Sequence, residues 1–380
     1  MKKVEEQGRI TPYYIYDLSL LGHTLDKLKT ASEPYGFKVH YALKANSNPE
    51  ILRLISESGL GADCVSGNEV LRAIESGFPS DSIAFAGVGK SDAEITIGLQ
   101  NDIFTFNVES TQEIRVIDDL AGKMGKTAGI ALRINPNVNA KTHHYITTGL
   151  EENKFGINSW EFVEVLSLLQ KSKNIELKGL HFHIGSQITE LSVFKGLCLR
   201  VNEIQQFFID HHIIPGHLNV GGGLGVEYEQ PDIALIPDFK AFFKVFHEHL
   251  ELQPQQQVHF ELGRAIVAQS GSLVTKVLFV KKGINVNFAI VDAGMTELIR
   301  PALYQSFHKI EKIGSESEKG QTVYDVVGPI CESSDCFAKR ILLPELNRGD
   351  LLVIRTTGAY GEVMSSNYNL RTKALAYYTS

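Results

Sequence analysis

The chain has 380 residues, of which 43% are hydrophobic and 21% charged, and its formal net charge is −7. This length and composition are typical of a globular protein with one large domain and a smaller one, and the acidic balance argues against nucleic-acid binding. No apolar run reaches membrane-spanning length, and the first residues lack the apolar segment of a signal peptide. The four cysteines form no CxxC pair, so we expect a cytoplasmic protein without disulfides.

A β-type run over residues 11–17 and a helix over 18–30 open the chain. Eight apolar strands are then predicted, separated by amphipathic helices. The strands cover residues 39–42, 61–65, 83–86, 103–107, 128–134, 177–184, 217–220 and 258–262. The helices between them cover residues 49–58, 68–76, 92–99, 111–123, 160–170, 191–211 and 238–249.

This alternation favours a parallel sheet, and eight strands are the number that closes a (β/α)8 TIM barrel. An open, doubly wound sheet is the alternative, but no G-x-G-x-x-G fingerprint follows the first strand. After about residue 268 the pattern changes to short β-rich runs at 272–281, 288–292, 322–328, 350–356 and 374–378. We therefore predict an α/β fold with a barrel at residues 22–268. Residues 1–21 and 269–380 should form a second, all-β domain of the sandwich or barrel type, which the strand at 11–17 joins.

In a TIM barrel the active site lies at the carboxyl ends of the strands. Those ends carry an amine, an imidazole, two acids and a glycine-rich loop, at Lys44, Asp63, Gly87, Asn107, Asn135, His183, Gly221 to Gly223, and Glu261. Lys44 follows the first barrel strand. A lysine that points into a closed pocket loses solvation and becomes a candidate nucleophile for a Schiff base. A solvated surface lysine is the alternative.

Two segments after the seventh and eighth strands are candidates for a phosphate site: NVGGGLG at 219–225 and ELGR at 261–264. Glycines let backbone N–H groups approach phosphate oxygens, and an arginine adds charge. A bare Gly-Gly-Gly is more often a flexible loop, but its place after strand seven favours the site. A Schiff-base lysine, a phosphate site and an acid such as Glu261, which could keep a pyridine nitrogen protonated, together indicate pyridoxal 5′-phosphate.

With these motifs the chain resembles the fold-type III pyridoxal-phosphate-dependent decarboxylases, which include the ornithine and arginine decarboxylases, and within them most closely the diaminopimelate decarboxylases. The resemblance runs nearly end to end. It is carried by YALKAN at 41–46, HFHIGSQ at 181–187, GGG at 221–223, ELGR at 261–264, DAGM at 292–295, RPALY at 300–304, GPICESSD at 328–335 and GAYG at 358–361. The chain departs from the family at Leu262, where proline is more common, and in the atypical AGVGK loop at 86–90.

The resemblance implies a role for each matching residue. Lys44 would carry the cofactor as a Schiff base with Asp63 in support, His183 would stack on its ring, and Glu261 would pair with the pyridine nitrogen. The phosphate would be bound by Ser186, Gly221, Gly222, Gly223, Gly263 and Arg264, with Tyr360 closing over it. The substrate's distal carboxylate would be received by Arg264, Arg300, Tyr304 and Tyr360. Its distal ammonium would be received by Glu332. Cys331 would donate a proton, and Cys331 and Glu332 would act in the partner's site of a homodimer with shared active sites.

The implied reaction is the decarboxylation of meso-2,6-diaminopimelate to L-lysine and CO2, the last step of lysine biosynthesis. Arginine forks match a distal carboxylate, which ornithine lacks. Two alternatives remain: a carboxynorspermidine decarboxylase of the same fold, and a non-catalytic homologue that binds the cofactor or a partner. We expect no metal site, although His181 and His183 form an H-x-H pair. Packing is the expected role of His181, Cys64, Cys198 and Cys336.

Overall fold

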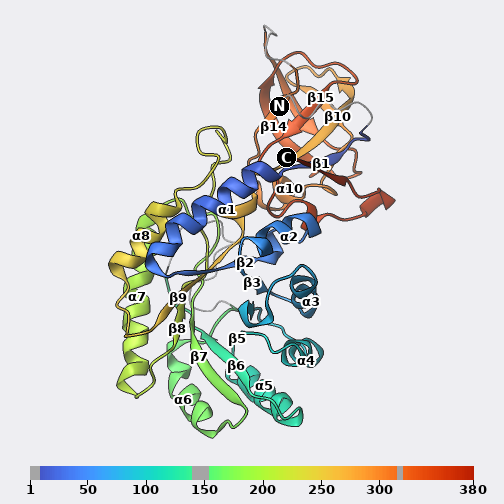
Figure 1. Ribbon diagram of the computed structural model, residues 1–380. Helices are drawn as coiled ribbons and strands as arrows, with labels where there is room; N and C mark the ends of the chain where they lie inside the picture. The colour runs from blue at the N-terminus through green and yellow to red at the C-terminus, as the bar shows by residue number, and fades with distance from the viewer. Residues whose placement is uncertain (1–8, 139–153, 315–319) are drawn as a thin grey trace. The chain divides into compact units, whose positions relative to one another are not determined.

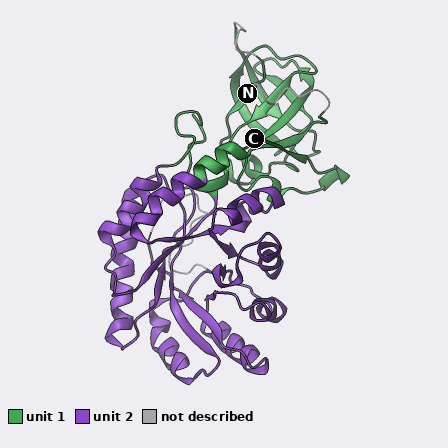
Figure 2. Cartoon of the chain, viewed as in Figure 1, with its two compact units in different colours: residues 1–24, 226–237, 264–380 green, residues 25–225, 238–263 purple. Residues whose placement is uncertain are grey.

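The computed structural model describes residues 9–138, 154–314 and 320–380, and it divides into two compact units (Figure 2). One unit comprises Leu25–Gly225 and Asp238–Gly263. The other comprises Met1–Thr24, Val226–Pro237 and Arg264–Ser380. The short segment Val226–Pro237, which follows the glycine-rich loop, therefore belongs with the C-terminal part of the chain.

The first unit is a closed barrel of eight strands, in which each strand pairs in parallel with the next and β2 pairs with β9 to close the ring (Figure 1). The predicted (β/α)8 barrel is confirmed, and the doubly wound alternative is wrong. The strands are β2 (Lys38–Ala42), β3 (Gly61–Cys64), β4 (Ile83–Phe85), β5 (Thr105–Val108), β6 (Ala128–Arg133), β7 (Ile175–His181), β8 (His217–Asn219) and β9 (Gln257–Leu262).

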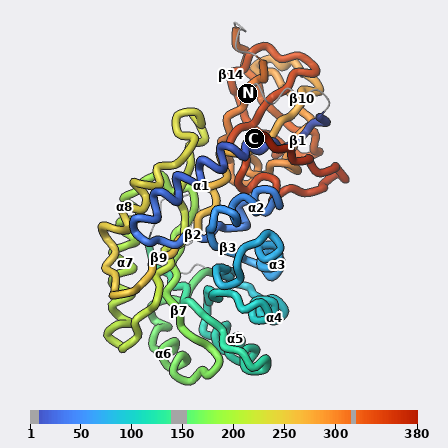
Figure 3. Tube along the Cα trace, viewed as in Figure 1, coloured from blue at the N-terminus to red at the C-terminus, as the bar shows by residue number. Residues whose placement is uncertain are grey.

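Helices α2 (Pro49–Glu57), α3 (Gly67–Glu75), α4 (Asp92–Gln100) and α5 (Thr111–Lys123) follow one another around the outside of the strands (Figure 3). Each begins at a polar side chain that accepts a backbone N–H group of the first turn; these caps are Asn48, Ser66, Ser91 and Ser110. The caps fix where these four helices start, soon after the strands that precede them. The other long helices are α1 (Leu18–Ser32), α6 (Phe162–Lys171), α7 (Leu191–Asp210) and α8 (Phe239–His249).

Three histidines stack inside the barrel, on the side away from the carboxyl ends of the strands. The His259 ring centroid lies 5.1 Å from that of His40, 4.6 Å from that of His217 and 5.5 Å from that of Phe104. All three histidines are buried, and His40 Nε2 lies 2.9 Å from His259 Nδ1. Burial lowers the pKa of His217 to about 3 and also lowers the pKa values of His40 and His259. The stack is therefore neutral at neutral pH.

We expect this stack to make the barrel sensitive to acid. Above the ordinary histidine pKa of about 6.5 the three rings are neutral whether the chain is folded or unfolded. Below it the unfolded chain binds protons that the folded barrel excludes. The free energy of unfolding should then fall by about 1.4 kcal/mol per pH unit for each histidine. For His217 the loss should continue down to about pH 3.

Urea unfolding between about pH 7 and about pH 5 measures this loss before most carboxylates titrate. His217→Phe keeps an aromatic ring against Phe104 and His259 but removes one titratable group. Its free energy of unfolding should therefore fall with pH less steeply than that of the wild type, by about 1.4 kcal/mol per pH unit. Parallel slopes for the two proteins would contradict the prediction.

The second unit is built on an eight-stranded sheet, in which six strands follow the order β12-β15-β10-β11-β13-β14 and the other two, β1 and β16, join through β10. The N-terminal strand β1 (Tyr13–Asp17) pairs antiparallel with β10 (Gly271–Lys281) and parallel with the C-terminal strand β16 (Leu375–Thr379). The predicted second, mostly β domain is confirmed. Its other elements are β11 (Asn287–Val291), β12 (Ile310–Lys312), β13 (Thr322–Val327), β14 (Cys336–Leu343), β15 (Leu351–Ile354), and the short helices α9 (Arg264–Val267) and α10 (Arg300–Tyr304).

Strands β12 and β14 were not predicted from the sequence. The pairing of β14 with β13 shifts register twice, and Arg340 inside it has a φ of 53°. These irregularities interrupt the alternation of apolar and polar residues by which a strand is recognised.

Within residues 9–138, 154–314 and 320–380, no helix combines the length and apolar character needed to cross a membrane.

Candidate active site

Lys44 and Asp63 meet at the carboxyl ends of neighbouring barrel strands. Lys44 lies in a 3₁₀ turn directly after β2, and Asp63 is in β3. The Lys44 ammonium donates to Asp63 Oδ2 at 3.2 Å. The Asp63 side chain is fully buried, whereas the Lys44 side chain is 38% exposed. The Lys44 side chain is thus partly exposed, between the two alternatives of a closed pocket and a solvated surface, and its ammonium is held by a buried acid.

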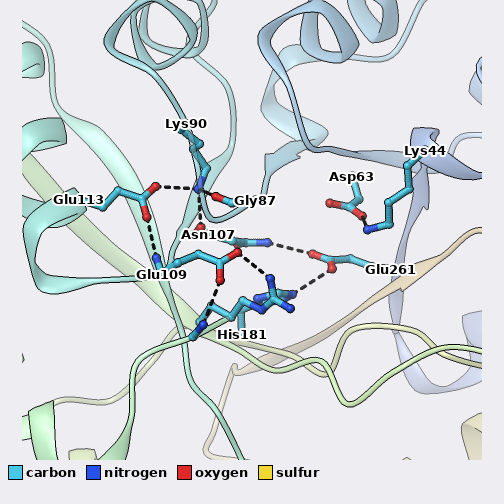
Figure 4. A network of polar contacts seen from close by, with 11 residues as sticks. Lys44, Asp63, Gly87, Lys90, Asn107, Glu109, Glu113, His181 and Glu261 are labelled. Carbon is cyan, nitrogen blue, oxygen red and sulfur yellow. Dashed lines mark hydrogen bonds and ion pairs between the residues drawn. The ribbon is translucent and has the colours of Figure 1, made fainter. Parts of the chain in front are cut away.

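Glu261, in β9, is a buried carboxylate held by side chains from three other barrel strands, β5, β7 and β8. Figure 4 shows two of them, Asn107 and His181. Its Oε1 accepts from Asn107 Nδ2 at 2.9 Å and from Asn219 Nδ2 at 2.7 Å, and its Oε2 lies 2.9 Å from His181 Nε2. Burial alone would raise the pKa of Glu261, but the charge and hydrogen bond of His181, with the charge of Lys44, hold it below its ordinary value. Glu261 is therefore an anion that can pair with a cationic ring nitrogen.

Asp63 is a second buried acid of the site, and its pKa is raised, whereas that of Glu261 is lowered. Burial and the nearby charge of Glu261 raise the pKa of Asp63 to about 7, although Lys44 opposes the shift. Among the described residues Asp63 Oδ1 has no hydrogen-bond partner. An acid with a pKa near neutrality and one open oxygen can exchange a proton with the amine beside it.

The glycine-rich loop packs against the backbone of the neighbouring strand ends. A Cβ atom at Gly222 would collide with the Glu261 carbonyl oxygen, and one at Gly221 would collide with the Phe182 carbonyl oxygen. A Cβ atom at Gly223 would lie 2.7 Å from the Gly185 carbonyl oxygen. The loop is a close-packed turn that requires glycine, and the alternative of a flexible loop is wrong.

This packing brings two more predicted residues, His183 and Ser186, to the loop, whereas a third, Gly263, lies against the turn that carries Lys44. Gly222 N–H donates to His183 Nδ1 at 3.4 Å, and Ser186 follows Gly185, which the loop contacts. A Cβ atom at Gly263 would lie 2.8 Å from Ala45 Cβ, which places Gly263 against the turn that carries Lys44. Desolvation, with the charge of Arg133, lowers the pKa of His183 well below its ordinary value, so its ring is neutral and suited to stacking.

The second unit contains a buried pair of arginines that share one phenol. Arg264 Nη1 donates to the Tyr228 hydroxyl oxygen at 2.6 Å, and Arg300 Nη1 donates to it at 3.0 Å. Arg300 Nη1 also lies 2.9 Å from His308 Nε2, and the Arg264 guanidinium lies 4.8 Å from the centre of the Tyr360 ring. Burial alone would raise the pKa of Tyr228, but the charges of the two arginines bring it below its ordinary value. The cluster is a concentration of positive charge suited to an anion.

The remaining predicted residues of this unit do not all join the arginine pair. Tyr304 ends α10, which starts at Arg300. Cys331 and Glu332 lie on the surface, where Glu332 Oε1 accepts from the Tyr368 hydroxyl at 2.8 Å and Cys331 N–H donates to Asn369 Oδ1 at 3.2 Å. Burial of Cys331 as a small apolar residue is therefore wrong, and the contacts of Glu332 are with Tyr368 rather than with an arginine.

Comparison with known proteins identifies the family. Residues 21–268 match the family described as pyridoxal-dependent decarboxylase, pyridoxal binding domain. The chain belongs to the pyridoxal-dependent decarboxylases. It is 53% identical over 368 residues to the diaminopimelate decarboxylase of Bacteroides thetaiotaomicron, covering 97% of this chain and 95% of that protein. The crystal structure of diaminopimelate decarboxylase from Helicobacter pylori complexed with L-lysine has a TM-score of 0.92 and 41% identity, covering 98% of this chain and 93% of that one.

The barrel residues fit the cofactor of this decarboxylase family. Lys44 presents an accessible amine, the Glu261 carboxylate is held ionised, and the loop at 221–223 leaves no room for side chains beside it. The open Oδ1 of Asp63 is a further polar atom available to the cofactor. An aldehyde, a pyridine nitrogen and a phosphate would each find a suitable group here.

Four site residues were missed or misjudged from the sequence. His181, expected to serve only in packing, bonds Glu261, and Asn219 does the same although only its place before the glycines was noted. Tyr228 and His308 were not singled out at all. A signal existed for the first pair, since both end barrel strands, but Tyr228 and His308 lie in segments without a motif. Among the described residues no group of three His, Cys, Asp or Glu side chains is arranged for a metal ion.

Proposed function

We propose that this decarboxylase acts on meso-2,6-diaminopimelate and releases L-lysine and CO2, the last step of lysine biosynthesis. The observation that carries the choice of substrate is Arg300. Its side chain is buried, and among the described residues it has no carboxylate partner. A buried guanidinium without an acid favours an anionic ligand, and the distal carboxylate of diaminopimelate supplies one. Several relatives named diaminopimelate decarboxylase, at 38–53% identity, support the same choice.

Each of the barrel residues has a separate proposed role at the end of the substrate that loses CO2. Bound pyridoxal phosphate supplies an electron sink for the bond between Cα and the departing carboxylate. In this proposal Lys44 holds the cofactor, and Asp63 exchanges a proton with the amine. Glu261 keeps the pyridine nitrogen protonated, and His183 lies against the ring. Ser186, Gly221, Gly222, Gly223, Gly263 and Arg264 bind the phosphate, and Tyr360 covers it.

Residues of the second unit would bind the distal end of the substrate, which carries the second carboxylate and the second ammonium. Arg264, Arg300, Tyr304 and Tyr360 are proposed to receive the distal carboxylate, and Glu332 the distal ammonium. Cys331 and Glu332 are exposed, which is consistent with a homodimer in which they serve the partner's site, with Cys331 as the proton donor. We further propose a cytoplasmic location, which suits a chain whose four cysteines are all free.

Measuring CO2 release from meso-diaminopimelate, with carboxynorspermidine and L-ornithine as competing substrates, tests the proposal. Diaminopimelate should be turned over with the highest kcat/KM, and Lys44→Ala should release no CO2. Faster turnover of carboxynorspermidine would contradict the choice of substrate. Cofactor absorbance without CO2 release from any of the three would instead favour a non-catalytic homologue.

A further inference from the structure

Lys90 is a buried cation that is linked to Glu261 through Asn107 and that the proposed function leaves without a role. It ends the atypical loop at 86–90, between β4 and α4, and its side chain is only 1% exposed. Its ammonium donates to the Gly87 carbonyl at 2.8 Å, to the Asn107 carbonyl at 2.8 Å and to Glu113 Oε1 at 2.7 Å. A lysine ammonium has three N–H donors, so each of them is used.

Lys90 thereby connects three segments at the carboxyl edge of the barrel: the loop after β4, strand β5 and helix α5. Gly87 follows β4, Asn107 lies in β5, and Glu113 is in the first turn of α5. The second oxygen of Glu113 accepts from the Glu109 N–H at 2.7 Å, which also fixes the backbone directly after β5 (Figure 4). We call Lys90 and the three groups that accept from it, in Gly87, Asn107 and Glu113, the clamp. A buried charge whose hydrogen bonds are all made rigidifies the groups around it.

The network continues through Glu109 to Arg133, whose charge also acts on His183. Glu109 Oε1 accepts from Arg133 Nη1 at 2.6 Å, and Glu109 Oε2 accepts from the Gly156 N–H at 3.0 Å. Arg133 ends β6. The position of Asn107 is therefore fixed within a chain of contacts that spans three neighbouring strands, rather than by a single bond.

Asn107 connects this clamp to Glu261, because it forms hydrogen bonds with both Lys90 and Glu261. Its carbonyl accepts from Lys90, and its side-chain Nδ2 donates to Glu261 Oε1 at 2.9 Å. Within the described part of the chain Asn107 Oδ1 has no hydrogen-bond partner. The amide is therefore held by its bond to Glu261 and by its own backbone, so the backbone position that Lys90 fixes decides where the amide can reach.

We propose that Lys90 is a positioning residue, which acts through Asn107 to hold the Glu261 carboxylate toward the cofactor's pyridine nitrogen. This rests on the role of Glu261 in the proposed function. Lys90 itself touches neither cofactor nor substrate. Losing it should loosen Asn107 and let the carboxylate turn, so the protonation state of the bound cofactor should change even when the barrel remains folded.

The test compares Lys90→Met with a matched control, Lys126→Met. Lys126 makes the same kind of clamp, because its ammonium donates to the Leu99 and Gln100 carbonyls and to Asp102 Oδ1 at 2.8 Å. Its clamp has no contact with Glu261 or with the three side chains that hold it. Both changes remove one charge and three hydrogen bonds, but the Lys126 side chain is 29% exposed and that of Lys90 only 1%. The double variant with Glu261→Gln therefore decides whether an effect seen only for Lys90→Met passes through Glu261.

Three measurements on purified holoenzyme decide the outcome: the pH titration of the cofactor's visible absorbance, the dissociation constant for pyridoxal phosphate, and kcat and KM. Lys90→Met should shift the spectroscopic titration by about one pH unit, weaken cofactor binding about tenfold and lower kcat about tenfold with little change in KM. Lys126→Met should leave all of them near the wild-type values. If Lys90→Met does not accumulate as folded protein, Glu113→Gln, which removes the charge from the other end of the clamp, should give smaller shifts in the same direction.

Combining Lys90→Met with Glu261→Gln separates this proposal from the one on which it rests. The two changes should be non-additive, because Lys90 has little left to position once the Glu261 charge is gone. Strong effects of Glu261→Gln, with Lys90→Met no different from Lys126→Met, would overturn the role of Lys90 alone. A Glu261→Gln holoenzyme with an unchanged titration and kcat would overturn the role of Glu261, and the role of Lys90 with it.

Discussion

Glu261→Gln is expected to lower kcat for decarboxylation by about 10²–10³-fold, the usual cost of removing one preorganised charge from an active site. The amide keeps the shape of the carboxylate and can still contact Asn107 and Asn219. It cannot provide the negative charge that His181 and Lys44 stabilise in the folded protein. A neutral partner should leave the pyridine nitrogen unprotonated and the cofactor a poorer electron sink.

Steady-state kinetics and the absorbance of the bound cofactor check this result together. Glu94→Gln is the control, because Glu94 is another hydrogen-bonded glutamate of the barrel unit: its carboxylate accepts from the Gly67 and Ser91 backbone N–H groups, where that of Glu261 is held by side chains. Its kcat should stay within about twofold of the wild-type value, as expected for a change away from the site. A Glu261→Gln enzyme as active as the Glu94→Gln enzyme would contradict the role given to Glu261.

Arg300→Ala is expected to lower kcat/KM for meso-diaminopimelate by more than about a hundredfold, since an unpaired buried charge costs about 3–5 kcal/mol. The loss should be specific to substrates with a distal carboxylate. L-lysine has the distal ammonium but no such carboxylate. Any residual turnover of L-lysine should therefore fall much less, and the preference for diaminopimelate over L-lysine should shrink.

Tyr228→Phe tests the same arginine pair without removing either positive charge. It removes the hydroxyl that both arginines share but keeps both guanidinium groups and the aromatic ring. Because the arginines lose only a shared acceptor, kcat/KM should fall by about tenfold, the cost of one hydrogen bond to a charged group. An unchanged kcat/KM for Arg300→Ala would remove Arg300 from substrate recognition.

The position of a residue at a strand end was the part of the site that the sequence predicted well. Lys44, Asp63, His183 and Glu261 all follow from counting eight strands and reading what comes at the end of each. That reasoning is sound because parallel strands in a closed barrel bring their carboxyl ends together. It could not say which of these groups touch, and it could not decide between a closed pocket and a solvated surface for Lys44, whose side chain is 38% exposed.

Residues that act by holding other residues were mostly missed. Tyr228 lies in the segment Val226–Pro237, and no motif in that segment indicates that it belongs with the C-terminal unit. Asn107 was named only as a strand-end residue, and Lys90 only as part of an unusual loop. Their partners are 154 and 23 residues away in the chain, and no local pattern reports contacts at such separations. The bulged strand β14 was missed for a related reason, since its irregular pairing hides the alternation that marks a strand.

The claim on which the account depends is that the amine of Lys44 carries the cofactor. Borohydride reduction of the holoenzyme, followed by proteolysis and mass spectrometry, tests it most directly, because reduction converts a Schiff base into a stable secondary amine. The account predicts a single pyridoxyl-modified peptide with the label on Lys44, and no label in Lys44→Ala. A label on another lysine, or no label on a protein that binds the cofactor, would contradict it.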